Sequence, residues 1–396
     1  MISLCYIFVP SPMKLRLLAL IAFLGFADAG WSQTTPAQPQ KHLIQLGWDQ
    51  PTTAFVRDHW EEMEKGSPFD GLVVVLHADH AGRVINENAI LDATPWPRSV
   101  LAAAREDLRA CAFTRFRHNF IRVNSTPGKL DWFDDQQWQA AAAHLGHVAW
   151  LCRESGFKGI CYDTEVYGAK QYGWNPASGR SFPETCAKAR QRGREVMQAM
   201  AAEYPAITIW GLWLFSLNRD AGGEDWEKVL REDGYGLWPA FLNGWLDALP
   251  PEARLVDGME DAYYFKKDKQ FAATHAELRD GPAVRRLVAP ENQAKYRAQV
   301  RVGFGIYLDA YLDRLGTKYA LPARRGGTRL QRLAATLATA RATADDYVWL
   351  YNEQVRWWQV PYRPEYTEEV RASVGKGRLA EEALPGITKS IRGERK

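Results

Sequence analysis

The chain has 396 residues, and its 50 Lys and Arg residues nearly balance 47 Asp and Glu residues, which leaves a formal net charge of +3. The two signs are interspersed, so the composition favours neither a nucleic acid nor an anionic membrane surface as a partner. No segment after residue 29 approaches the ~20 consecutive apolar residues of a membrane helix.

An export signal is the first predicted element along the chain. Basic residues follow Met13, an apolar run covers residues 17–26, and the sequence ADA at 27–29 has the small-x-small pattern that signal peptidases accept. The apolar run is too short to span a bilayer. We therefore expect residues 1–29 to be a signal peptide and 30–41 a flexible segment. The mature protein is expected in the periplasm or outside the cell, without a membrane attachment.

Eight short β-like runs follow, and helical patterns separate most of them. The runs cover residues 42–49, 71–77, 119–124, 157–163, 207–215, 254–260, 300–309 and 347–353. The helical patterns cover residues 97–111, 134–155, 182–203, 226–249 and 328–343. This alternation favours parallel strands joined by crossovers, and eight strands suit a protein of the α/β class with a (β/α)₈ TIM barrel. An open doubly wound sheet is the alternative, but no Gly-rich phosphate-binding turn follows an early run.

The barrel is expected to be a single catalytic domain with elaborated loops. It should cover residues 42–375 and be followed by a C-terminal tail, 376–396, whose basic end from residue 389 is solvated. The long charged segment 266–292 is expected to form a helical excursion over the barrel mouth.

Four cysteines remain beyond the signal, and their spacing fits no zinc knuckle, so buried free thiols or one structural disulfide are expected. They are Cys111, Cys152, Cys161 and Cys186.

Polar residues follow seven of the eight β-like runs at the point where each run ends. They are Trp48 and Asp49; His77, Asp79 and His80; Asn124; Asp163 and Glu165; Glu260 and Asp261; Asp309; and Asn352 and Glu353. In a (β/α)₈ barrel the C-terminal ends of the strands meet at one mouth, and the chemistry is located there. The sequence therefore predicts one polar site at that mouth.

The stretch GFKGICYDTEVYG, residues 156–168, carries the sharpest signal of this kind. Asp163 and Glu165 are two residues apart at a strand end, so their side chains point to the same side. Repulsion between two close carboxylates raises the pKa of one of them. A carboxylic acid that stays protonated near neutral pH is the group that a glycosidase uses to protonate a leaving oxygen. Glu165 is thus the predicted general acid/base, and Asp163 its tuning partner.

A second catalytic carboxylate is expected among acids with aromatic neighbours. Glu260, in VDGMEDAYYF, is the preferred candidate, and Glu353, in VWLYNEQVRWW, is the alternative. Aromatic faces beside a carboxylate are typical of a sugar subsite, and the chain has 16 Trp, 16 Tyr and 16 Phe. The residues predicted to bind substrate are Trp48, Asp49, His77, Asn124, Tyr167, Trp213, Tyr263, Asp309, Trp349 and Tyr351.

Other chemistries have weaker support. A single cluster of His77, Asp79 and His80 could ligate a metal, but without a second set of ligands the binding of substrate hydroxyls is favoured, and no metal or cofactor is expected. No Gly-x-Ser-x-Gly motif is present, and no cysteine has a histidine in a recognisable frame, which argues against a Ser or Cys nucleophile.

On the three stretches quoted above, the chain resembles the bacterial (β/α)₈ glycoside hydrolases. In the large clan of retaining barrels, a Glu at the end of strand four is the acid/base and a Glu at the end of strand seven is the nucleophile. Glu165 matches the first position, but the seventh run ends in Asp309, and Glu260 ends the sixth. The chain is also similar to chitinase-like barrels in the final D-x-E of strand four, although Lys158 and Cys161 replace the two earlier acids of that motif.

The expected function is that of an exported glycoside hydrolase that acts on an oligo- or polysaccharide, which is the expected partner. Two alternatives stay open: a carbohydrate-binding barrel without turnover, and a metal-dependent hydrolase that uses the cluster around His77.

Overall fold

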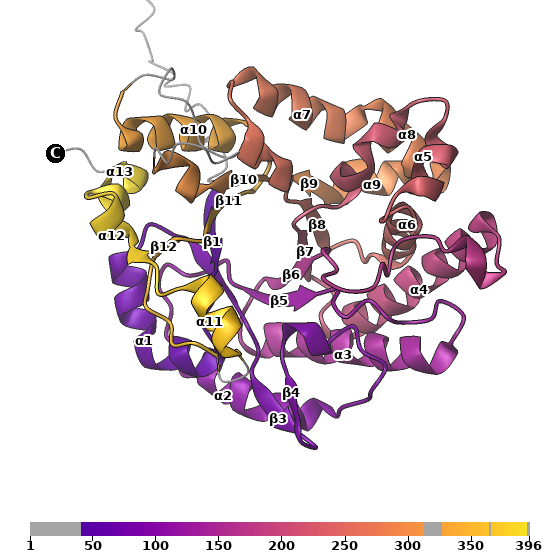
Figure 1. Cartoon of the computed structure of the whole chain (residues 1–396), viewed down its shortest axis with the longest axis horizontal. Helices are drawn as coiled ribbons and strands as arrows, with labels where there is room; N and C mark the ends of the chain where they lie inside the picture. The colour runs from indigo at the N-terminus through magenta and orange to yellow at the C-terminus, as the bar shows by residue number, and fades with distance from the viewer. Residues whose placement is uncertain (1–40, 313–326, 364–365, 394–396) are drawn as a thin grey trace, which may run out of the picture. The chain divides into compact units, whose positions relative to one another are not determined.

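A computed structural model describes residues 41–312, 327–363 and 366–393 of the chain (Figure 1). The predicted signal peptide and nearly all of the segment 30–41 lie outside the described residues. Each of the eight β-like runs contains a strand of one parallel sheet. The strands are β1 (His42–Gly47), β2 (Gly71–Val74), β5 (Phe120–Asn124), β6 (Gly159–Asp163), β7 (Thr208–Gly211), β8 (Arg254–Asp257), β9 (Val300–Val302) with β10 (Phe304–Tyr307), and β11 (Tyr347–Asn352).

The sheet closes on itself at Gly303, which separates β9 from β10. The strand order is β10-β11-β1-β2-β5-β6-β7-β8-β9, so the two ends of the sheet are consecutive in the chain. β9 pairs with β8, whereas β10 pairs with β11. A Cβ at Gly303 would lie 2.9 Å from the Tyr347 carbonyl oxygen, so glycine permits this close approach. One bent seventh strand therefore completes the barrel, and the predicted (β/α)₈ fold is confirmed.

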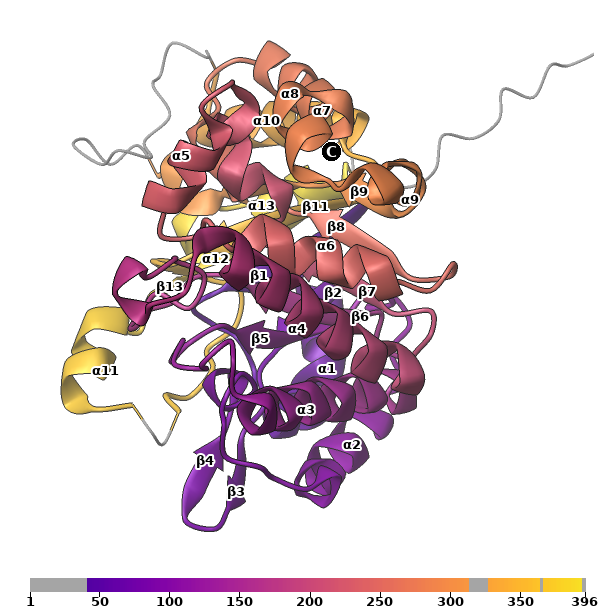
Figure 2. The ribbon, with the colours of Figure 1, turned by 90° about the vertical axis from the view of Figure 1, so that its right-hand side faces the viewer.

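Helices cover the outside of the barrel (Figures 1 and 2). They are α1 (Thr53–Gly66), α2 (Ala102–Arg109), α3 (Asp135–Glu154), α4 (Phe182–Glu203), α5 (Trp226–Glu232), α6 (Trp238–Ala248), α7 (Lys269–Asp280), α8 (Pro282–Leu287), α9 (Gln293–Gln299) and α10 (Arg329–Thr343). Short 3₁₀ helices lie between them: η1 (Glu87–Ala89), η2 (Arg98–Leu101), η3 (Pro176–Ser178), η4 (Phe215–Gly222), η5 (Glu260–Tyr264), η6 (Pro290–Asn292) and η7 (Leu308–Tyr311).

The predicted helices 134–155, 182–203 and 328–343 correspond closely to α3, α4 and α10. The predicted helix 226–249 is instead divided into α5 and α6, because the chain turns at Gly236, where a Cβ would lie 1.7 Å from the Leu230 carbonyl oxygen. Helix α1 was not predicted. Its N-terminal signal is Thr52, whose side chain accepts a hydrogen bond from the amide of Phe55 at 3.3 Å.

The segment 266–292 does not extend over the barrel mouth as expected. Its main helix, α7, packs on the outside of the barrel beside α10 and β9 (Figure 1). The buried side chain of Phe271 anchors it, with ring centroids 5.1 Å from those of both Phe265 and Phe304. The apolar face of α7 decides its position, and the charged residues of the segment face solvent.

The predicted C-terminal tail, 376–396, is folded as far as residue 392, although the basic residues Lys389 and Arg392 are exposed. Three short elements form there: β13 (Arg378–Leu379), α12 (Ala380–Ala383) and α13 (Ile387–Arg392). β13 pairs with β12 (Val355–Arg356). Ile387 and Ile391 are buried, and the Arg392 guanidinium donates to the Ser67 carbonyl at 2.6 Å. The chain end is thus packed against the barrel.

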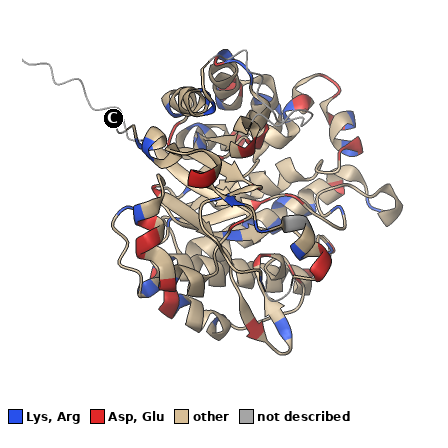
Figure 3. Cartoon of the chain, turned by 60° about the vertical axis from the view of Figure 1, so that its left-hand side comes forward, with Lys and Arg blue, Asp and Glu red and all other residues tan. Residues whose placement is uncertain are grey.

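Two further elements project from the barrel at strand ends. β3 (Ala78–His80) and β4 (Arg83–Ile85) form an antiparallel hairpin, and α11 (Glu368–Val374) follows β12. Charged residues of both signs are interspersed over the ribbon (Figure 3). Within the described ranges, no helix is both long and apolar enough to cross a membrane.

Candidate active site

Four carboxylates follow barrel strands at the C-terminal mouth. Asp163 ends β6 and Glu165 lies two residues later; Glu260 begins η5 after β8, and Glu353 follows β11. The strands are parallel, so these positions share one end of the barrel. Burial raises the pKa of Glu260 well above its ordinary value, and the negative charges of Glu165 and Asp163 raise it further. These three carboxyl groups are therefore close enough to repel one another.

Asp163 has partners for both of its carboxylate oxygens. Oδ2 forms a salt bridge with Arg122 of the neighbouring strand β5, and Oδ1 accepts a hydrogen bond from the backbone amide of Glu165 at 3.1 Å. The Asp163 side chain is almost fully buried. Arg122 also donates to Gln50 Oε1 at 2.9 Å. Burial alone would lower the pKa of Arg122, but Asp163 and Glu87 outweigh it and raise the pKa, which keeps the guanidinium charged.

Glu165 is a partly buried carboxyl group with a raised pKa. Burial is the largest cause, the hydroxyl of Tyr167 opposes it by donating to Oε2, and the charge of Asp163 contributes a smaller increase. The sequence predicts that repulsion raises one pKa of the Asp163–Glu165 pair. The pKa of Glu165 is raised, but burial is the main cause and repulsion by Asp163 is a smaller one. The Asn124 side chain donates to the Glu165 carbonyl at 3.1 Å, which helps to hold the loop in place.

A strained turn presents Glu260. The preceding residue, Met259, has φ 43° and ψ 64°, a left-handed conformation that side chains other than glycine rarely adopt. The buried Asp257 carboxylate stabilises this turn by accepting hydrogen bonds from Met259 N at 3.3 Å and from Ser216 N at 2.9 Å. Strain that neighbouring groups hold in place is common at functional sites.

Aromatic side chains form a wall beside the acids. The Tyr263 ring lies 5.5 Å from Tyr351 in a stacked arrangement and 5.3 Å from Trp349. The indole of Trp48 donates to the Tyr351 hydroxyl at 2.9 Å, and the Tyr307 hydroxyl donates to Glu353 Oε2 at 3.0 Å. Glu353 and Glu260 both add to the raised pKa of Tyr351, of which burial is the main cause. The wall thus connects Glu353 with the other three acids.

Large apolar side chains are also exposed around this mouth. Trp48 is 37% exposed, Tyr167 67% and Tyr264 42%, and they follow β1, β6 and β8 respectively. Exposed aromatic faces near carboxylates are suited to packing against sugar rings. In contrast, at least five tryptophans are fully buried: Trp138, Trp210, Trp238, Trp245 and Trp349. The high Trp content therefore reflects the core as well as the site.

Three of the residues predicted to bind substrate are buried and have contacts within the protein. Asp49 is buried and accepts hydrogen bonds from Gln45 at 2.7 Å, Asn352 at 2.8 Å and the Trp357 amide at 2.6 Å. Asp309 is buried and accepts the backbone amides of residues 354 and 355 at 2.6 and 3.3 Å. Trp349 is inaccessible and donates to the Gly258 carbonyl at 2.8 Å. These groups stabilise the barrel mouth.

Of the other predicted residues, His77 and Trp213 are partly accessible, whereas Asn124 is not. His77, after β2, is half-buried, and so is Trp213, whose indole donates to Asp261 at 3.4 Å. Asn124 is buried and acts on the backbone of the Glu165 loop. A substrate contact by His77 or Trp213 stays a prediction.

The metal hypothesis gains no support from the described part of the chain, in which no three His, Cys, Asp or Glu side chains are arranged to hold an ion. Asp79 and His80 belong to the β3–β4 hairpin, and Asp79 is exposed there. The four described cysteines are free, with Cys152 and Cys161 buried. Of the two alternatives for the thiols, the free form is the one observed.

Sequence reasoning missed two residues of the site, Arg122 and Gln50. Arg122 interrupts the apolar run FIRVN of β5, and a charge in the middle of a barrel strand is itself a signal, because burying it requires a partner. Gln50 gives no comparable signal, since its position beside Arg122 depends on the pairing of strands distant in sequence.

No family model and no curated protein matches the sequence. Solved structures match it only distantly. An exo-β-1,4-mannosidase from Opitutaceae bacterium strain TAV5 is 12% identical, with a TM-score of 0.46 over 89% of this chain and 59% of that chain. An endocellulase from Pyrococcus horikoshii is 10% identical, with a TM-score of 0.41 over 89% and 91%. A candidate sugar phosphate isomerase/epimerase from Anabaena variabilis is 11% identical, with a TM-score of 0.40 over 91% and 89%. This chain thus spans less than two thirds of the mannosidase, and its activity has to be inferred from its own residues.

Proposed function

We propose that the protein is a glycoside hydrolase that cleaves an oligo- or polysaccharide with Glu165 and Glu260 as its two catalytic carboxylates. The observation that carries the proposal is the pair itself: two carboxyl groups that follow β6 and β8, the strands on either side of β7, both with a raised pKa, one of which is raised by the charge of the other. Glycosidases require two carboxyl groups of which one is protonated and the other ionised at the working pH.

The surroundings of the pair favour a particular distribution of the proton. Burial raises the pKa of Glu260 well above its ordinary value, and the charges of Glu165 and Asp163 raise it further. The Tyr167 hydroxyl donates to Glu165 and so stabilises its ionised form. In this proposal Glu260 is accordingly the protonated member of the pair and Glu165 the ionised one. This is the reverse of the roles expected from the sequence, in which Glu165 is the general acid/base.

Asp163 acts as a positioning residue in this proposal. Its two oxygens accept hydrogen bonds from Arg122 and from the Glu165 amide, so it orients the loop that carries Glu165. An Asp that assists an N-acetyl group of the substrate, as in the chitinase-like barrels, has to be accessible to that group, whereas the Asp163 side chain is 1% exposed. Two-carboxylate catalysis is accordingly preferred to substrate-assisted catalysis.

The wild-type protein should release 4-nitrophenol from an aryl glycoside in a panel that covers the common pyranoses in both anomeric forms. Glu165→Gln and Glu260→Gln should each lower kcat about 10²–10⁴-fold, the usual contribution of acid/base assistance. The variant that lacks the general acid should recover most with a better leaving group, such as 2,4-dinitrophenol, because that group hardly needs protonation. This comparison assigns the acid to Glu260 or to Glu165.

A carbohydrate-binding barrel without turnover predicts a different result. Oligosaccharides would bind to wild-type, Glu165→Gln and Glu260→Gln proteins alike, and none of the three would release a product. Near-normal turnover by both variants would contradict the assignment of either carboxylate.

Export is proposed as well, on the basic, apolar and small-residue pattern of residues 13–29.

A further inference from the structure

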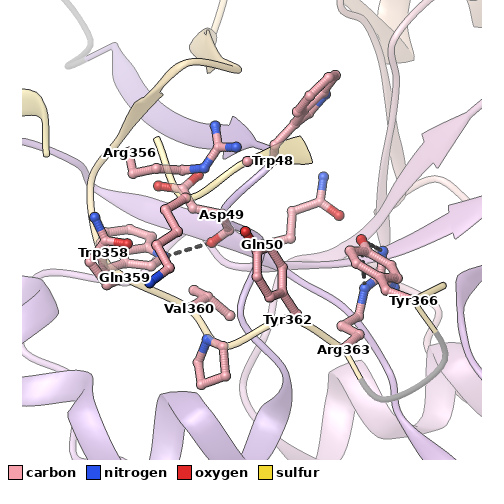
Figure 4. A pocket seen from close by; sticks show the side chains of 13 residues that line it. Trp48, Asp49, Gln50, Arg356, Trp358, Gln359, Val360, Tyr362, Arg363 and Tyr366 are labelled. Carbon is pink, nitrogen blue, oxygen red and sulfur yellow. Dashed lines mark hydrogen bonds between the residues drawn. The ribbon is translucent and has the colours of Figure 1, made fainter. Parts of the chain in front are cut away.

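A cavity of about 300 Å³ opens between the segments that follow β1 and β12 (Figure 4). Residues 48–50, which follow β1, form one wall, and Arg356 of β12 with residues 358–363 forms the other. Asp163, Glu165, Glu260 and Glu353 do not line it, whereas the buried Asp49 does. Its volume is at the lower end of the range for small-molecule sites and suits a single sugar ring.

The walls of the cavity combine aromatic faces with hydrogen-bonding side chains. Trp48 and Tyr362 supply rings, Gln359 an exposed amide, and Lys376 an exposed amine. The Arg356 guanidinium lies 5.7 Å from the centre of the Trp48 ring. A sugar offers the complementary surface, since it has an apolar CH face and a rim of oxygen atoms.

Gln50 provides the observation that points to a ligand. Its side chain is only 8% exposed, and Oε1 accepts a hydrogen bond from Arg122 at 2.9 Å. The same side chain lines the cavity. The N–H donors of a side-chain amide at this position suit an oxygen of a bound ligand as acceptor.

The cavity is connected to the acids through two chains of contacts. Gln50 bonds to Arg122, which pairs with Asp163, and Trp48 bonds to Tyr351 of the aromatic wall. A carbohydrate whose scissile bond lies at Glu165 and Glu260 could therefore extend toward β1 and place a neighbouring residue in the cavity.

We propose that this cavity is a second sugar subsite, which binds a residue of the same carbohydrate other than the one whose bond is cleaved. The bound ring packs on Trp48 and Tyr362 and offers an oxygen to the Gln50 amide. The positive charges of Lys376 and Arg356 would pair with an acidic substituent on that ring. The identification of the ligand as a carbohydrate rests on the proposed function; the location of the subsite does not.

Titration calorimetry on the Glu165→Gln protein tests the proposal without turnover. The probes are cello-, manno- and xylo-oligosaccharides and galacturonan-derived oligosaccharides of two to six units, so that neutral and acidic rings are both included. For a sugar that binds, the affinity should rise about tenfold, or 1.4 kcal/mol, at the length that reaches the cavity. Adding Tyr362→Ala, or separately Gln359→Ala at an exposed position, should remove this step.

Val370→Ala is the matched control, because Val370 is an exposed apolar residue on the adjacent helix α11 and does not line the cavity. An affinity step that persists in both cavity variants, or the absence of a step for sugars that bind, would overturn the subsite. Turnover by the wild-type protein without a cavity-dependent step would reject this inference alone. If the affinity rises with length through the cavity but the wild-type protein releases no product, the proposed hydrolase activity is rejected and the subsite is retained.

Discussion

Arg122 of β5 and Asp163 of β6 form a salt bridge between neighbouring barrel strands, with their side chains 20% and 1% exposed. A charge at this depth is tolerated only with a partner. The pair therefore does more than fix Asp163 in place. It compensates one negative charge of a mouth that also contains Glu165, Glu260 and Glu353.

Replacing Arg122 with Met should leave Asp163 buried without its cation. Removal of one partner of a buried ion pair typically costs 3–5 kcal/mol, so we expect a loss of about that size in the free energy of unfolding, measured in urea. The double variant Arg122→Met/Asp163→Asn should regain most of the loss, because no uncompensated charge remains. Equal stability of Arg122→Met and wild type would show that Asp163 does not depend on this pair.

Glu260→Gln should stabilise the protein at neutral pH. The pKa of Glu260 is raised on folding, so wild type has its full stability below the ordinary pKa of Glu, about 4.3, where both states are protonated. As the pH rises above that value, the unfolded chain ionises more readily than the folded one and stability is lost. Gln does not titrate.

The melting temperature of Glu260→Gln, minus that of wild type, should thus grow between pH 4 and pH 7. Glu184→Gln is a suitable control, since Glu184 is an exposed residue of α4 with one exposed ion pair. A difference that is constant with pH would contradict the raised pKa of Glu260.

Much of the fold could be predicted, because a strand of a closed parallel barrel is buried on both faces and reads as a short apolar run. The polar residues after those runs indicated where the mouth lies, because the C-terminal ends of all the strands meet there. What each residue does there could not be predicted. Trp48 and Trp349 are both tryptophans near strand ends, yet one is 37% exposed and the other is inaccessible. Only the pairing of distant strands decides which of them faces the core.

The position of segment 266–292 could not be predicted either, because it too depends on tertiary packing. Its many charges suggested an exposed excursion, whereas the apolar side chain of Phe271 packs against Phe265 and Phe304 and holds α7 to the barrel wall. A few buried contacts outweigh a larger number of solvated charges in deciding where a helix lies.

The export prediction concerns the precursor. Expression of the full sequence in a bacterial host should give a mature protein that starts near Gly30 and is found in the periplasm or the medium, as read by N-terminal sequencing. Replacing Ala27 and Ala29 with a larger residue should block cleavage, because signal peptidases require small side chains at these positions. Recovery of a cytoplasmic protein that retains Met1 or Met13 would contradict the prediction.

Tyr263→Phe should separate stability from activity. The Tyr263 side chain is only 7% exposed, and within the described residues its hydroxyl has no hydrogen-bond partner. Phe keeps the ring contacts with Tyr351 and Trp349 and removes only this unsatisfied group, whose burial typically costs 1–3 kcal/mol. The melting temperature of the empty protein should accordingly stay the same or rise.

The activity of Tyr263→Phe should nevertheless fall, by about tenfold in kcat/KM on the best aryl glycoside, if the hydroxyl is kept unpaired in order to bond to substrate. Tyr296→Phe is the matched control, because Tyr296 is a buried core residue whose hydroxyl donates to the Leu278 carbonyl at 2.6 Å. That variant should lose stability, since the carbonyl is left unpaired, and retain its activity at a temperature where it is folded. A Tyr263→Phe protein with unchanged kinetics would mean that its hydroxyl does not contact the substrate. Lower stability without a kinetic effect would assign it a structural role instead.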